Sequence, residues 1–343
     1  MAFSQSEIDN AVEYQGYFGP AVIFQSPVSP RENVRLNYRH QGLWIPSHQD
    51  RAWFTPSVFA DNEARAFIME EGRMLEGRGG KDIFGIEWEF VPSAMGSIVR
   101  PGNPTLRDIT AWRDVITFPD VKAWDWEASG RLNENYLKNS PAYQNFCIFT
   151  GWFERLISFM DFGPAAAAVM RKNTRPYAVE LFEKFTDLWI EVADMVKATY
   201  GDLVDGIAIH DDWGAQDGPF FNEKIVRETL VPAMKRFTDH CHALGYTTEL
   251  HSCGRLGNLI GCIADAGFDS WDGMAINDYP AAYEKWGDRL MMFVPAEEGK
   301  GPEDYAALYC NRDKPVYLSS YASVTADYIK ELYRISRTEF DKQ

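Results

Sequence analysis

A repeated order of short apolar stretches and amphipathic stretches is the feature that most constrains this chain. From about residue 143 to the C-terminus, strand-like segments alternate with helix-like segments at least six times. The two clearest strand patterns cover residues 203–210 and 246–250, and a helical stretch of roughly 222–244 lies between them. Such alternation predicts an α/β fold with a parallel sheet. We therefore expect a (β/α)8 TIM barrel, with a doubly wound open sheet as the alternative.

The first 80 residues are less regular and predict an N-terminal helical extension that packs on the barrel. The barrel itself is expected to cover residues 81–343, in one structural domain overall. A short helix is expected to begin at Pro30, because proline suits the first helical position and Ser29 is a good N-cap. A second helix is expected over residues 62–76, where glycines follow.

The charge and the cysteines exclude several classes of protein. The formal net charge of −16 argues against nucleic acid and anionic membranes as partners. No run approaches 18 apolar residues and the N-terminus is polar, so we expect neither a membrane span nor a signal peptide. The five cysteines lack the spacing of a disulfide framework, which favours a reducing, cytoplasmic setting. For the oligomeric state, a homodimer remains an open alternative.

Polar residues follow both of the clear strand patterns directly. Asp211 and Asp212 come after the first strand, and His251 and Cys253 come after the second. Active sites of parallel barrels lie at the carboxyl ends of the strands, so we expect these four side chains to face one cavity. His251 and Cys253 are two residues apart and therefore point to one face of a strand. Imidazole and thiolate together suit Zn²⁺, and a packed histidine beside an inert cysteine is the alternative.

Further residues complete the predicted site. Glu298, after the strand pattern of residues 290–294, is expected to supply a third, oxygen ligand, and a solvated glutamate is the alternative. Asp211, Asp212 and His251 are expected to act as acid, base or orienting groups. For either aspartate, a helix cap or an arginine partner is the competing interpretation. Residues expected to line the substrate pocket are Trp152, His210, Trp213, Gln216, Trp271 and Tyr321.

An ordered set of short segments carries a family resemblance: residues 82–89, 118–120, 151–156, 210–216, 242–245, 251–254, 266–269 and 277–278. As a set they resemble the uroporphyrinogen decarboxylase superfamily, and most closely its corrinoid-dependent methyltransferase branch. The resemblance covers most of the chain and implies a TIM barrel. It also implies a zinc site built from a His-x-Cys pair, matched by His251 and Cys253, and a distant third cysteine. Ser319 and Ser320 stand where that cysteine is expected, which counts against a thiol-methylating reaction. The third ligand is then expected to be Glu298, Cys310 or another acidic residue, and a site without tightly bound metal is the alternative.

The resemblance implies a methyltransferase that moves a methyl group from a small methylated substrate to the Co(I) of a separate corrinoid protein. The aromatic content favours an aromatic methyl ether, and a quaternary amine held by cation–π contacts is the alternative. Two other functions are weighed. A cofactor-free decarboxylase would use Asp211 or Asp212 to stabilise a cationic ring, but the arginine-rich signature of that enzyme is missing. The third is a non-catalytic corrinoid- or ligand-binding barrel.

Overall fold

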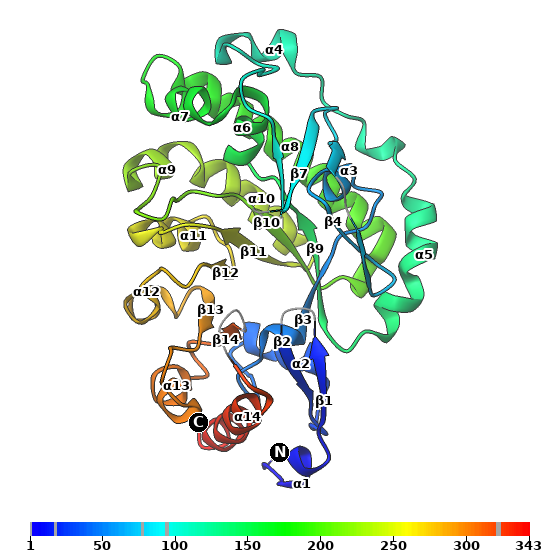
Figure 1. The fold of residues 1–343 in the computed structure, drawn as a ribbon, viewed down its shortest axis with the longest axis vertical. Coiled ribbons are helices and arrows are strands. Elements are labelled where there is room, and N and C mark those ends of the chain that lie inside the picture. The colour runs from blue at the N-terminus through cyan, green and yellow to red at the C-terminus, as the bar shows by residue number, and fades with distance from the viewer. Residues whose placement is uncertain (1, 17–18, 77–78, 93–95, 320–323) are drawn as a thin grey trace. The chain divides into compact units, whose positions relative to one another are not determined.

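The computed structural model describes residues 2–16, 19–76, 79–92, 96–319 and 324–343 (Figure 1). The chain forms two compact units. The terminal unit comprises residues 1–52, 141–143 and 269–343, and the central unit comprises residues 53–140 and 144–268.

The centre of the central unit is a set of parallel strands. β9 (Tyr143–Ile148), which begins in the terminal unit, pairs with β10 (Gly206–His210), and β10 pairs with β11 (Thr247–Ser252). The strands are buried along almost their whole length, as expected for a parallel sheet covered by helices. The helices that follow them are α6 (Phe153–Met160), α7 (Phe162–Met170), α8 (Arg175–Tyr200), α9 (Glu223–Thr229), α10 (Val231–Ala243) and α11 (Ile260–Asp265).

The helical stretch predicted over residues 222–244 is two helices rather than one. α9 ends before Leu230, and α10 begins at Val231. Pro232 lies in the first turn of α10, where its missing N–H costs no hydrogen bond. The first helix begins as the sequence suggests, because the side chain of Asn222 accepts a hydrogen bond from the N–H of Ile225 at 3.0 Å.

Strands occupy much of the remaining central unit. Its elements are β3 (Arg51–Phe54, beginning in the terminal unit), α3 (Ala60–Ala64), β4 (Phe67–Glu70), β5 (Arg73–Glu76), β6 (Gly79–Lys81), β7 (Glu87–Val91), β8 (Gly96–Val99), α4 (Trp112–Val115) and α5 (Trp126–Asn139). Short 3₁₀ turns lie at Ile109–Ala111, Val121–Ala123, Gly201–Leu203 and Gly257–Leu259.

The helix predicted over residues 62–76 is wrong. α3 ends at Ala64, and β4 and β5 then form an antiparallel hairpin in which Glu70 pairs with Arg73. The two residues of the turn, Glu71 and Gly72, have φ of 49° and 74°. Two successive positive φ angles are typical of the tight turn that joins hairpin strands, and they end any helix.

A buried ion cluster joins three segments of the central unit. The guanidinium of Arg155 on α6 donates hydrogen bonds to Asp61 on α3 and to Asp82 at 2.5 Å. All three side chains are almost completely buried. Burial raises the pKa of Asp61 to about 6; Arg155 opposes that rise, and the neighbouring carboxyl group of Asp82 adds to it. The cluster fixes the start of α6, which lies next to the site described below.

The terminal unit combines an N-terminal part with the last strands. β12 (Ser270–Gly273), β13 (Met291–Pro295) and β14 (Val316–Ser319) are parallel neighbours in that order. Its other elements are α1 (Ser6–Asp9), β1 (Val12–Gly16), β2 (Gly19–Ile23), α2 (Pro30–Tyr38), the 3₁₀ turn His48–Asp50, α12 (Tyr279–Trp286), α13 (Pro302–Tyr309) and α14 (Ala326–Phe340). The predicted start of α2 is confirmed, because Ser29 Oγ accepts a hydrogen bond from the N–H of Glu32 at 3.1 Å.

Both units therefore contain parallel strands that alternate with helices, and the TIM-barrel-like fold predicted from the sequence is confirmed. Within the described ranges, every helix is too short or too polar to cross a lipid bilayer.

Candidate metal centre at the ends of β10 and β11

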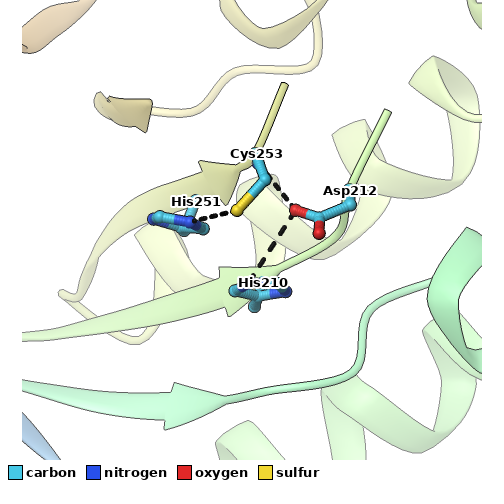
Figure 2. A group of neighbouring side chains, drawn as sticks. All are labelled: His210, Asp212, His251 and Cys253. Atoms are coloured by element: carbon cyan, nitrogen blue, oxygen red, sulfur yellow. Dashed lines mark hydrogen bonds and ion pairs between the residues drawn. The ribbon is translucent and has the colours of Figure 1, made fainter. Parts of the chain in front are cut away.

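Two pairs of side chains meet at the carboxyl ends of β10 and β11 (Figure 2). His210 and His251 are direct partners in the parallel register of these strands. Asp212 follows His210 by two residues, as Cys253 follows His251, so each pair points to one face. Potential ligand atoms of the four side chains all lie within 4.8 Å of one another. Four of the predicted site residues are thus brought together.

The contacts within this group are short. His251 Nε2 lies 3.3 Å from Cys253 Sγ, and His210 Nε2 lies 3.8 Å from Asp212 Oδ1. The N–H of Cys253 donates to Asp212 Oδ1 at 2.6 Å, which ties the end of β11 to the end of β10. The two imidazole rings stack, with centroids 4.6 Å apart and an interplanar angle of 15°.

Glycines let the two strand ends approach each other. A Cβ on Gly254, which has φ of 84°, would lie 2.2 Å from the backbone of Gly214. A Cβ on Gly214 would in turn lie 2.8 Å from the carbonyl oxygen of Arg255. Both distances are shorter than any contact that a Cβ atom makes. Close backbone packing therefore requires glycine at positions 214 and 254.

Asp211 lies beside the group of four and supports the backbone around it. Its side chain is completely buried. It accepts hydrogen bonds from the N–H of Glu154 at 2.9 Å and from Trp213 Nε1 at 2.8 Å. A Cβ on Gly151 would lie 2.7 Å from Asp211 Cβ, so the aspartate packs tightly against the end of β9. Asp211 and the buried Trp213 therefore bind the strand ends to each other.

Glu154, in the first turn of α6, is a functional candidate that was missed in the sequence. Its Oε2 lies 2.5 Å from His210 Nδ1, and its Oε1 lies 3.2 Å from the guanidinium of Arg65. Arg65 also lies over the ring of Trp88, 5.1 Å from its centroid. The sequence does contain a signal, because Glu154 opens the helix that follows the strand-like segment beginning near residue 143.

The electrostatics of the site follow from this burial and pairing. Burial acts to raise the pKa of Glu154, but His210 and Arg65 outweigh it and lower the pKa to about 2. Burial acts to lower the pKa of His210, but Glu154 and Asp212 outweigh it and raise the pKa above its usual value. Burial raises the pKa of the Cys253 thiol, with His251 opposing it. Burial also raises the pKa of Asp211 to about 7, helped by the charge of Glu154.

A narrow apolar crevice adjoins the two histidines. It has a volume of about 10 Å³, comparable with the space for a single water molecule. Trp53 stands edge-on to His251, with ring centroids 6.3 Å apart, and packs against Phe149 and Phe67. The crevice is lined by Trp53, Cys147, Ile148, Phe149, Ala208, Ile209, His210 and His251.

The other predicted site residues are not part of this group of four. Trp152 is in the core, where its Nε1 donates to Thr186 Oγ1 at 2.9 Å. Gln216 is exposed in the turn after the strand end. In the terminal unit, Trp271 is buried and stacks on Tyr279, and Glu298 is exposed after β13. Tyr321 lies outside the described residues.

The donor set fits a zinc ion. Ligands at about 2.0–2.3 Å from a tetrahedral ion lie about 3.3–3.8 Å from one another. The 3.3 Å between His251 Nε2 and Cys253 Sγ falls in that range. The 3.8 Å between His210 Nε2 and Asp212 Oδ1 lies at its upper limit, and the four groups spread over up to 4.8 Å, so the side chains would have to move closer together to bind an ion. Two imidazoles, a thiol and a carboxylate are all groups that zinc accepts. Glu298 and Cys310, the sequence candidates for a third ligand, are in the terminal unit, whereas all four of these residues are in the central unit.

Neither the protein-family models nor the curated protein sequences contain a match to this chain. A methyltransferase from Methanosarcina mazei has a similar structure, with a TM-score of 0.56 and 13% sequence identity over 92% of this chain and 99% of its own. A xylose isomerase-like TIM barrel protein from Mycobacterium smegmatis reaches a TM-score of 0.35 at 9% identity, over 62% of this chain and 78% of its own. The first likeness shows that this chain shares its fold, over nearly its whole length, with a protein described as a methyltransferase.

Proposed function

We propose that the protein is a methyltransferase that takes a methyl group from a small methylated substrate and passes it to the Co(I) of a separate corrinoid protein. The observation that carries this proposal is the group of His210, Asp212, His251 and Cys253 at the ends of β10 and β11. The similarity in fold to a methyltransferase and the segments that resemble the corrinoid-dependent branch support it.

The site would hold zinc through His210, His251, Cys253 and Asp212. When bound, zinc supplies a Lewis acid that lowers the cost of breaking the bond between a methyl group and its carrier oxygen. Catalytic zinc sites keep one position for substrate. Asp212 is the candidate to yield that position, because it is a hard oxygen ligand whose Oδ1 also accepts the N–H of Cys253 at 2.6 Å.

The chain's own residues have separate roles in this proposal. His210, His251 and Cys253 bind the ion, and Asp211 orients the strand ends through its bonds to Glu154 and Trp213. In the transfer, the bond between oxygen and the methyl carbon breaks and a bond from cobalt to that carbon forms. The electron pair stays on the oxygen, which then binds a proton.

The apolar crevice supports a substrate whose methyl group is uncharged. Its aromatic and aliphatic lining gives the histidines an apolar surface on the side that faces Trp53 and Phe149. We therefore favour an aromatic methyl ether over a quaternary amine as the donor.

Incubation of the protein with Co(I) cobalamin and a panel of methylated compounds tests this function. The panel contains methoxybenzenes, simple methyl ethers and quaternary methylamines, and the visible spectrum reports methyl–cobalt formation. We expect methyl–cobalt from a methoxybenzene, and none from the His251→Ala variant. No transfer from any member, together with release of carbon dioxide from a carboxylated tetrapyrrole, would overturn the proposal in favour of a decarboxylase.

A further inference from the structure

We propose that Glu154 is a positioning residue, which fixes the imidazole of His210 so that its Nε2 atom faces the metal position. This inference rests on the zinc site of the proposed function.

The contact between Glu154 and His210 determines which nitrogen can bind a metal. Glu154 Oε2 lies 2.5 Å from His210 Nδ1, while His210 Nε2 is the nitrogen that faces Asp212. An ionised carboxylate accepts hydrogen bonds and donates none, so Nδ1 must carry the hydrogen. In the neutral ring, Nε2 is then the nitrogen whose lone pair can bind a metal. A carboxylate behind a metal-binding histidine orients the ring and increases its basicity.

Glu154 is itself held at both oxygens. Oε2 accepts from His210, and Oε1 accepts from Arg65 at 3.2 Å. The side chain is only 13% exposed, and its N–H donates to the buried Asp211. The packing of Arg65 over Trp88 fixes the far end of this chain of contacts. A carboxylate with so little freedom is suited to hold a ring in one orientation.

The competing explanation is that the ion pair between Arg65 and Glu154 only stabilises the fold. A double-mutant cycle on zinc affinity separates the two explanations, because it cancels damage that Glu154→Gln does independently of His210. Zinc dissociation constants are measured by chelator competition for the wild type, Glu154→Gln, His210→Ala and the double variant. Glu180→Gln is the matched control, since Glu180 pairs with Arg113 on the exposed surface of α8.

We expect Glu154→Gln to weaken zinc binding by about 10–100-fold in the wild-type background and by less than about twofold in the His210→Ala background. Glu180→Gln should bind zinc like the wild type. Equal losses in both backgrounds would overturn the positioning role. So would unchanged affinity in Glu154→Gln alone.

A second readout covers the case in which His210→Ala binds zinc too weakly to titrate. The ¹⁵N spectrum of the zinc-loaded wild type reports which nitrogen of His210 carries hydrogen, and we expect Nδ1; hydrogen on Nε2 would contradict the inference. If the variants change zinc affinity as expected but the wild type transfers no methyl group, the positioning role of Glu154 stands and only the methyltransferase reaction is overturned. A wild type that binds no zinc would overturn both.

Discussion

His210 and His251 are register partners on adjacent parallel strands, and their imidazole rings stack with centroids 4.6 Å apart. Their spacing is therefore set by the hydrogen-bond ladder between β10 and β11 rather than by loops. Asp212 and Cys253 follow the ends of these strands at the same offset, and the hydrogen bond from the N–H of Cys253 to Asp212 Oδ1 holds them together. Sites built on strands hold their geometry more precisely than sites built on loops.

Substitutions of His210 and of Glu298 test which of the two residues acts with His251 and Cys253. The structure favours His210, and the sequence predicts Glu298. The His210→Ala variant should bind zinc more than about 100-fold more weakly, because it loses a ligand whose orienting partner alone is worth about 10–100-fold. Glu298→Gln should leave zinc affinity unchanged, since Glu298 is exposed after β13 and is not in the group of four. Chelator competition measures both. A large loss in Glu298→Gln with none in His210→Ala would reverse the assignment.

Replacement of the crevice wall should weaken substrate binding. Trp53→Leu removes the ring that packs against Phe149 and faces His251. We expect KM for the methyl donor to rise by about 10–200-fold, the effect of losing about 1–3 kcal/mol of apolar contact, with zinc content unchanged. Trp286→Leu, on α12, serves as the control. An unchanged KM in Trp53→Leu would remove the crevice from the substrate site.

The buried cluster around Arg155 makes stability depend on pH. The pKa of Asp61 is raised from its ordinary value of 3.8 to about 6, so the folded chain keeps a proton that the unfolded chain releases between about pH 4 and 6. This contribution to the free energy of unfolding is present below pH 4 and is lost as the pH rises through 6. It amounts to no more than about 3 kcal/mol.

Urea unfolding from pH 4 to pH 7 measures that dependence. The Asp61→Asn variant, although less stable, should lose this part of the pH slope. Asp217→Asn replaces an exposed aspartate and should keep the wild-type slope. Identical slopes for the wild type and Asp61→Asn would show that Asp61 does not carry the proton.

Substitution of one turn glycine tests the hairpin that replaces the predicted helix. Gly72 has φ of 74°, and a Cβ there would lie 2.8 Å from the ring of Tyr136. We expect Gly72→Ala to lower the free energy of unfolding by about 1–2 kcal/mol, because alanine is strained at positive φ. Gly163→Ala, in α7 where a Cβ meets open space, should be neutral or stabilising by up to about 1 kcal/mol. Equal unfolding midpoints for the two variants would contradict the hairpin.

The sequence predicts the fold and the juxtaposition of His251 and Cys253 because both depend on local periodicity. The alternation of strands and helices and the i, i+2 spacing of His251 and Cys253 are visible without any tertiary contact. The helix predicted over residues 62–76 fails because two residues, Glu71 and Gly72, turn the chain.

The remaining ligands depend on long-range contacts that a single sequence does not show. His210 is predicted from the sequence as a substrate-binding residue, and the register of β10 against β11, which places it opposite His251, is not visible in the sequence. Glu154 joins His210 across 56 residues, through the packing of α6 on the end of β10. No periodicity in the sequence predicts such a contact. Asp211 differs from Asp212 for the same reason, since only burial against Gly151 and Trp213 separates their roles.

Cobalt(II) titration of the metal-free protein tests the central claim most directly, because a thiolate ligand gives Co(II) a charge-transfer absorption that imidazole and carboxylate do not. We expect one equivalent of Co(II) with that absorption in the wild type, its loss in Cys253→Ser, and weakened binding in His251→Ala. The control variants His240→Ala and Cys310→Ala should match the wild type. Binding of no metal by the wild type, or an unchanged spectrum in Cys253→Ser, would contradict the metal centre on which the proposed function depends.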